Sequence, residues 1–208
     1  MKFYQFSLLL KSFFLKSNKK KYYESLLIDK YTGINSYKKL VEEFETATFK
    51  PTAEKVLFMG LVFGMSQKMI LKKLGNPSLI HIVSKKEEIY VLSYTLKIMK
   101  KRAKADFHFF RNKLFYVNVN FYNQEINSIE DVLKILKIKY GNFLSSGKTF
   151  FKNNLNNSIG IDVNLGLSLN YYSMCSNFHE KFNVLRKIEE QKSIKEKDKQ
   201  SKILFENL

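Results

Sequence analysis

The clearest pattern in this chain is an alternation of apolar and polar residues between positions 106 and 121. Phe107 and Phe109 alternate with polar neighbours, and the alternation resumes after a short polar break. A period of two is typical of a strand with one buried face and one wet face. The pattern predicts strands at about 105–110 and 114–121, with a tight hairpin at Arg111-Asn112-Lys113, and a further strand at about 89–98 is predicted from its composition.

A short helix is predicted just before these strands. Ser66 is a good N-cap, and Gly64 allows a sharp turn before it. Gly75 suits the left-handed position after a helix, and Pro77 cannot continue one. The helix is too short to be stable alone, so we expect it to pack on the sheet. Its apolar face consists of Met69, Ile70 and Leu74.

A DNA-binding helix-turn-helix is the competing interpretation of the same stretch. That motif needs a recognition helix directly after the turn. Here Pro77 follows, and then the segment 89–98, which is rich in Ile, Val, Leu, Tyr and Thr. This composition favours a strand.

The same order of a capped helix followed by strands is then predicted a second time. Ser128 with Asp131 resembles a capping box, and Gly141-Asn142 ends the second helix. Alternating residues then predict two further strands, at 159–163 and 167–171, joined by a turn at 164–166. We expect an α+β fold in which two helix-plus-sheet units form one continuous antiparallel sheet. The helices that begin at Ser66 and Ser128 should lie on the same face.

Both flanks of these units are predicted to be helical. An apolar stripe near the N-terminus, a second helix from Ser36 and a short helix at 53–61 precede the core. From Asn177 onward the pattern is helical again, and residues 192–202 carry mixed charge. The expected organisation is an N-terminal helical segment at 1–50, an α+β core at 51–176 and a charged helix at 177–208.

A family resemblance follows from the first unit. Phe63-Gly-Met-Ser66, the helix, Leu74-Gly-x-Pro77 and the Tyr-bearing strand together resemble the small BamE-like outer-membrane assembly lipoproteins. They also resemble the β-lactamase-inhibitor-protein-like fold. The match covers residues 61–121, with a second copy at about 126–173. The resemblance implies a non-enzymatic binding scaffold. The chain has no lipobox and its single cysteine is Cys175, so a lipid anchor does not carry over.

Composition narrows the class of protein. A hydrophobic content of 45% in 208 residues is enough for a sizeable core. One cysteine excludes an internal disulfide and fits a reducing compartment. No apolar run approaches the length of a membrane span, and we expect no signal peptide because Lys11 interrupts the early apolar run. The expected location is cytoplasmic.

Charge is the feature that points most directly to a partner. The formal net charge is +17, which is typical of proteins that bind nucleic acid or an anionic surface. An AT-rich genome would also raise the lysine content without any selection for binding. Both interpretations stay open.

The densest basic cluster lies between the first two predicted strands. Tyr90, Tyr94 and Tyr116 are near enough in sequence to stack on bases. The alternative is a solvated hairpin tip without function. The candidate binding residues are Lys97, Lys100, Lys101, Arg102 and Lys104.

Motifs for catalysis or cofactor binding are weak. Gly141 to Thr149 is similar to a phosphate-binding loop, but five residues separate its glycines and a helix precedes it. Cys175 and His179 are four residues apart, and two ligands do not make a structural zinc site. We expect no metal, no cofactor and no enzymatic activity. The leading hypothesis is a scaffold that binds a protein partner; the alternatives are a nucleic-acid-binding protein and an enzyme of unknown class.

Overall fold

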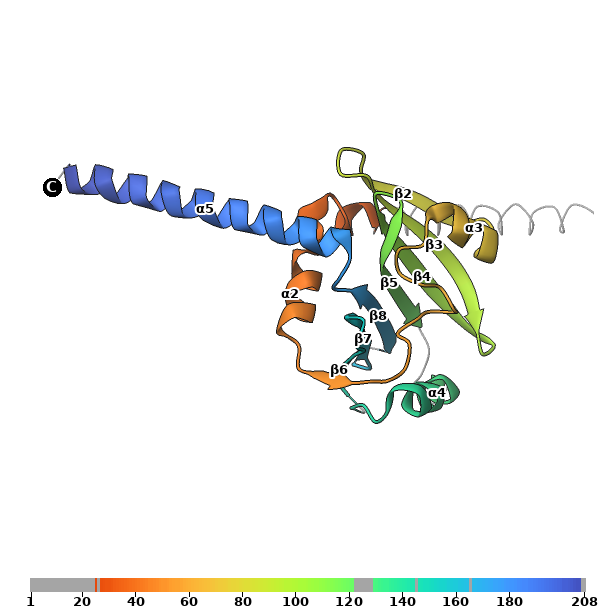
Figure 1. Ribbon diagram of the computed structural model, residues 1–208. Coiled ribbons are helices and arrows are strands. Elements are labelled where there is room, and N and C mark those ends of the chain that lie inside the picture. The colour runs from red at the N-terminus through yellow and green to blue at the C-terminus, as the bar shows by residue number, and fades with distance from the viewer. Residues whose placement is uncertain (1–24, 26, 122–128, 145, 165, 207–208) are drawn as a thin grey trace, which may run out of the picture.

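The computed structural model describes residues 25, 27–121, 129–144, 146–164 and 166–206. It is a three-layer α+β arrangement in which helices cover both faces of one sheet (Figure 1). The predicted α+β class, with helices near both ends, is confirmed. The apolar stripe expected near the N-terminus and the Ser128 cap lie outside the described residues.

The sheet has eight strands in the order β1-β6-β7-β8-β5-β4-β3-β2. Neighbouring strands within each predicted unit pair antiparallel, and the two units join through β5 and β8. β1 pairs with β6 in parallel, so the sheet as a whole is mixed rather than purely antiparallel. The strands are β1 (Phe49–Pro51), β2 (Leu79–Ser84), β3 (Ile89–Ile98), β4 (Lys101–Phe110), β5 (Lys113–Phe121), β6 (Lys148–Lys152), β7 (Asn157–Asp162) and β8 (Leu167–Ser173).

The helices α3 (Gln67–Leu74) and α4 (Glu130–Tyr140) pack on the same face of the sheet, as predicted. Ile70 of α3 and Leu136 of α4 both belong to the larger buried cluster. The other face is covered by η1 (Ile34–Tyr37), α2 (Lys38–Thr46) and the beginning of α5 (Asn177–Glu206). Among the described residues, no helix is long and apolar enough to cross a membrane.

The predicted ends of α3 are confirmed. The Ser66 hydroxyl accepts a hydrogen bond from the Met69 amide at 3.4 Å, as an N-cap does. Gly75 has a φ of 77°, and its amide donates to Leu71 O. Gly141 ends α4 in the same way, with a φ of 93°. α4 has Ile129 at its N-cap position, with no side-chain cap.

Residues 53–61 do not form the predicted helix. Phe58 and Leu61 instead form an isolated antiparallel bridge, with Met59 and Gly60 both at positive φ between them. The apolar residues that suggested a helix are buried against the sheet: Val56, Phe58 and Leu61. Tertiary packing therefore replaces the expected helical hydrogen bonds.

Candidate functional site

The first site of interest is the base of α5. The Ser176 hydroxyl accepts a hydrogen bond from the His179 amide at 3.3 Å and so caps the helix. Phe178 and Phe182 are then buried on the sheet, and Phe178 stacks on Phe115 with ring centroids 3.9 Å apart. From residue 187 onward, every side chain that the structure describes in α5 is exposed.

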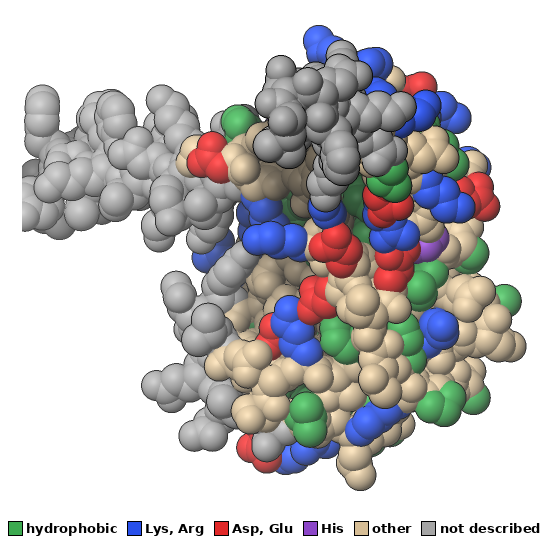
Figure 2. Space-filling view, turned by 90° about the vertical axis from the view of Figure 1, so that its left-hand side faces the viewer, with side chains coloured by type: hydrophobic (Ala, Val, Ile, Leu, Met, Phe, Trp, Pro, Cys, Tyr) green, Lys and Arg blue, Asp and Glu red, His purple; other side chains and the backbone are tan. Residues whose placement is uncertain are grey.

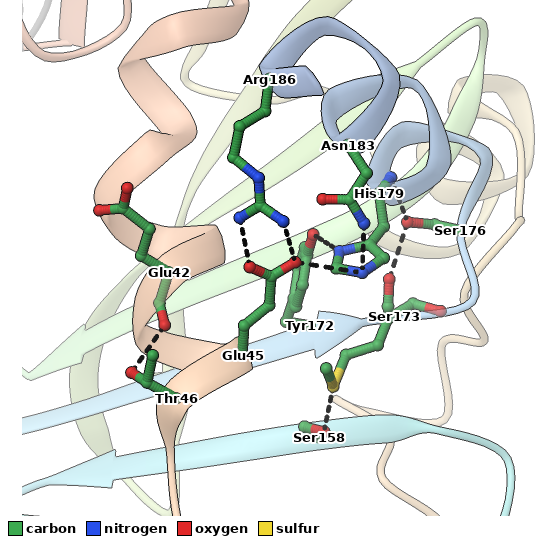
Figure 3. A network of polar contacts seen from close by, with 11 residues as sticks. Glu42, Glu45, Thr46, Ser158, Tyr172, Ser173, Ser176, His179, Asn183 and Arg186 are labelled. Carbon is green, nitrogen blue, oxygen red and sulfur yellow. Dashed lines mark hydrogen bonds and ion pairs between the residues drawn. The ribbon is translucent and has the colours of Figure 1, made fainter. Parts of the chain in front are cut away.

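Five polar side chains, which we call the α5 anchor, fix this base (Figure 3). The Arg186 guanidinium forms a forked ion pair with Glu45, with Nη1–Oε2 at 2.5 Å and Nη2–Oε1 at 3.4 Å. His179 Nε2 lies 3.7 Å from Glu45 Oε1, and its Nδ1 lies 2.9 Å from the Tyr172 hydroxyl. The members are Glu45 of α2, Tyr172 of β8, and His179, Asn183 and Arg186 of α5.

The anchor holds its groups in defined protonation states. Burial lowers the pKa of His179, while the neighbouring Glu45 partly opposes that effect. Burial raises the pKa of Tyr172 well above its usual value. At neutral pH the network therefore consists of a neutral imidazole, a neutral phenol and one carboxylate–guanidinium pair. These contacts join α2, β8 and α5, although the buried Asn183 Oδ1 has no hydrogen-bond partner among the described residues.

Sequence reasoning missed the α5 anchor. A signal was present, because His179, Asn183 and Arg186 recur at helical spacing directly beside the apolar stripe. Glu45 and Tyr172 carried no such signal, since the packing of α2 and α5 on the sheet brings them to this point.

A second cluster of polar side chains lies on the face of the sheet that packs against α2. Strand register aligns Ser93, Asp106, Asn118 and Asn170 on neighbouring strands, and we call these four residues the polar row. Ser93 Oγ donates to Asp106 Oδ1 at 2.5 Å, and Asn118 Nδ2 donates to Asn170 Oδ1 at 2.8 Å. The Tyr116 hydroxyl donates to the same Asn170 oxygen at 2.7 Å. The row is thus largely satisfied within the protein.

Two titratable groups beside each other on β4 are shifted strongly. Burial raises the pKa of Asp106, although Lys104 and the Ser93 hydrogen bond oppose the shift. Burial lowers the pKa of His108 well below its usual value. His108 Nδ1 lies 2.9 Å from the Tyr37 hydroxyl, whereas its Nε2 is buried without a hydrogen-bond partner. His108 is therefore a neutral histidine surrounded by aromatic side chains on the face of the sheet that packs against α2.

The five predicted basic residues lie at or near the turn between β3 and β4, but not all on one face of the sheet. β3 ends before Met99 and Lys100, and both of these turn residues have positive φ. The register places Lys97 opposite Arg102, on the face that α2 covers, whereas Lys101 is paired with Ile98 on the opposite face. Lys104 is half-buried, and its Nζ lies 3.9 Å from Asp106 Oδ1. Lys97, Lys100 and Arg102 remain exposed.

Two of the three nearby tyrosines are not available to stack on bases. Tyr94 and Tyr116 are each 3% exposed, and the Tyr94 hydroxyl donates to Gly75 O. Only Tyr90 keeps partial exposure. On the side from which α5 projects, the coloured acidic and basic side chains are interspersed and do not form a region of one sign (Figure 2).

The other sequence motifs have structural roles. Gly141 ends α4 and Lys148 begins β6, so a helix precedes a strand and the order of a phosphate-binding loop is reversed. Lys148 pairs with Glu43 and Asp162. Cys175 Sγ contacts Leu155 O at 3.4 Å. Within the described parts of the chain, no three His, Cys, Asp or Glu side chains are placed to hold a metal ion.

Comparison with known proteins gives little similarity. No known family matches the chain, and no curated protein matches it. Among solved structures, a cysteine-rich secretory protein from Staphylococcus aureus subsp. aureus Mu50 matches with a TM-score of 0.38 and 10% identity. The match covers 61% of this chain and 51% of that chain, so this chain corresponds to about half of its length. A likeness at this level assigns neither fold family nor function.

The resemblance to BamE-like lipoproteins and to the β-lactamase-inhibitor-protein-like fold was wrong. No family match supports it, and the structural match is to a protein of a different kind. The residues that suggested it, from Phe63 to Ser66 and from Leu74 to Pro77, encode only the turn and cap of one short helix. Serine caps and glycine ends are common among helices, so they do not identify a family.

Proposed function

We propose that this protein is a non-enzymatic scaffold that binds a macromolecular partner, most readily another protein, through α5. The supporting observation is that α5 is fixed at its base and projects away from the rest of the described residues beyond it (Figure 1). Among the described side chains, the contact furthest along α5 is a hydrogen bond from Asn35 to Glu189 at 3.3 Å. The remaining residues, 190–206, project over about 25 Å.

An unsupported helix of this length is marginal in water without tertiary contacts. A partner that covers it would supply those contacts, as in the binding of a helix in a groove. Ile194 is an exposed apolar side chain on the projecting part, and Val184 and Ile188 are exposed on the anchored part of α5 just before it. The charges from Lys187 to Lys202 are mixed in sign, which favours a protein surface over a phosphate backbone.

The test is a chain that ends after residue 190, which keeps the α5 anchor. Full-length and shortened proteins, equally tagged, are cross-linked in the native cell and their partners compared by quantitative mass spectrometry. We expect the shortened protein to keep its melting temperature and to lose specific partners. A purified partner should then bind the full chain at least tenfold more tightly. Equal partner recovery by both chains would contradict the proposal.

Nucleic-acid binding is the second candidate, and the net charge of +17 favours it. Its proposed site is the exposed part of the basic hairpin: Lys97, Lys100 and Arg102. Changing these three residues to Glu should abolish retention on heparin and lower the salt dependence of RNA binding. The matched control changes Lys68, Lys85 and Lys86 to Glu, which alters the net charge equally at another place. Equal binding by both variants would show that the charge at the hairpin is not specific.

The cytoplasmic location stays a prediction, which cell fractionation checks. Absence of enzymatic activity also stays a prediction.

A further inference from the structure

The two edges of the sheet differ in their protection. β1 forms one edge and is only three residues long. It contains Pro51, and Lys50 Nζ donates to Asn142 O at 2.9 Å. Short length, proline and lysine are the usual means by which proteins prevent another strand from adding to an edge. We therefore expect no further strand to add at β1.

The other edge carries none of these devices within its strand. β2 spans six residues, contains neither proline nor lysine, and has no further strand beyond it among the described residues. Its outward N–H and C=O groups are therefore a template for an added strand. A one-residue irregularity between Ile82 and Ser84 shifts its register, so Leu79 to Ile82 form the regular part of this edge.

Two exposed isoleucines lie on this edge. Ile80 is 58% exposed and Ile82 is 45% exposed. Their cross-strand partners are Leu92 and Tyr90, which places both isoleucines on the same face of the sheet as α3. An added strand would bring its own side chains beside them on that face, because residues on one face of paired strands are neighbours.

We propose that the outer edge of β2 binds an extended, acidic segment of a partner protein as an added strand. Backbone hydrogen bonds would provide affinity, and alternate side chains packed against Ile80 and Ile82 would provide specificity. Nucleic acid has no peptide backbone to pair with β2 and no alternating side chains to pack against the two isoleucines. This surface is separate from α5, so the inference and the proposed function can fail independently.

The positive charge of the chain favours an acidic partner over a second copy of the same chain. The chain carries a net charge of +17, so a second copy pairing edge to edge would bring two strongly positive molecules into contact. Lysines lie on both sides of the strand in sequence: Lys72 and Lys73 precede it, and Lys85 and Lys86 follow it, ahead of Glu87 and Glu88. Acidic residues flanking an apolar, β-branched stretch are the complement of this arrangement.

The test uses a displayed library of random linear peptides, selected on the full-length protein. We expect enrichment of peptides with alternating β-branched residues flanked by Asp or Glu. One such peptide should slow hydrogen exchange in residues 79–84. Ile80→Lys with Ile82→Lys should weaken its binding at least tenfold, and Ile138→Lys should not, since that isoleucine is 85% exposed on α4. N-methylation of alternate peptide amides should weaken binding similarly.

Four outcomes would overturn the inference. The selected peptides could protect residues other than 79–84, or bind the double variant as well as the unchanged protein. They could also tolerate N-methylation at every amide, which would exclude strand addition. A concentration-dependent dimer that the double variant loses would assign this edge to a second copy. Circular dichroism and melting of each variant establish that the fold is intact.

Discussion

Gly160 of β7 lies directly opposite Phe150 of β6, and the Phe150 ring occupies the space that a side chain at Gly160 would need. A Cβ built on Gly160 would come within 2.8 Å of Phe150 Cε1. Phe150 in turn meets Phe44 edge-on, with ring centroids 5.4 Å apart. The missing side chain therefore allows an aromatic contact between the sheet and α2.

Replacing Gly160 with Ala should destabilise the protein, because the Phe150 ring must move away from Phe44. We expect a loss of about 1–3 kcal/mol in the free energy of unfolding, which is typical of overpacking. Urea denaturation measures it. Phe150→Leu should recover part of the loss in the double variant, because the smaller side chain leaves room for the new methyl group. Strict additivity of the two single changes would contradict this explanation.

Replacing Gly75 with Ala tests the end of α3. Gly75 has a φ of 77°, a conformation that side chains with a Cβ rarely adopt. The cost should be about 1 kcal/mol, seen as a lower melting temperature. Gly33→Ala is the control, because Gly33 has an extended φ of 169° and no atom lies within 4 Å of its added Cβ. Equal effects of the two substitutions would argue against strain at Gly75.

Replacing Glu45 with Gln should loosen α5. The change removes the charge that pairs with Arg186 and faces His179. Arg186 is partly exposed, so the global loss should be no more than about 1 kcal/mol. The sensitive readout is faster hydrogen exchange at residues 179–189. Glu130→Gln breaks a surface-exposed pair with Lys134 and should change neither quantity. Unaltered exchange in α5 would show that the anchor does not hold the helix.

Acid should destabilise the protein through its buried His108. Burial lowers the pKa of His108 well below its usual value, whereas the unfolded chain binds a proton near pH 6.5. Below that pH the unfolded state holds more protons, so the free energy of unfolding falls as pH falls, by at most about 1.4 kcal/mol per unit for one histidine. His179 adds in the same direction, because burial also lowers its pKa.

The measurement is urea denaturation between pH 7 and pH 5.5 for the unchanged protein and for His108→Asn. The variant should be less stable at neutral pH but show a shallower dependence on pH. Asp106 works in the opposite sense in more acidic solution, because its raised pKa lets the folded state take up that proton first. Parallel pH profiles for the two proteins would exclude His108 as the source of acid sensitivity.

Local sequence signals determined much of the fold. Composition predicted β3, alternation predicted most of β5, and the Ser66 cap and Gly75 predicted the bounds of α3. The hairpin between β4 and β5 was also correct, with Asn112 at a φ of 59°. These features depend on residues near one another in sequence, where period and turn chemistry act directly.

Only the tertiary structure decided the rest. Residues 101–104 are too charged to be predicted as strand, yet cross-strand pairing with β3 makes them one. β1 and β6 are short and pair in parallel across about a hundred residues of chain. The α5 anchor joins Glu45 to Arg186, and the polar row aligns four strands. Hydrogen bonds and burial between distant segments fixed these features, and no local pattern carries that information.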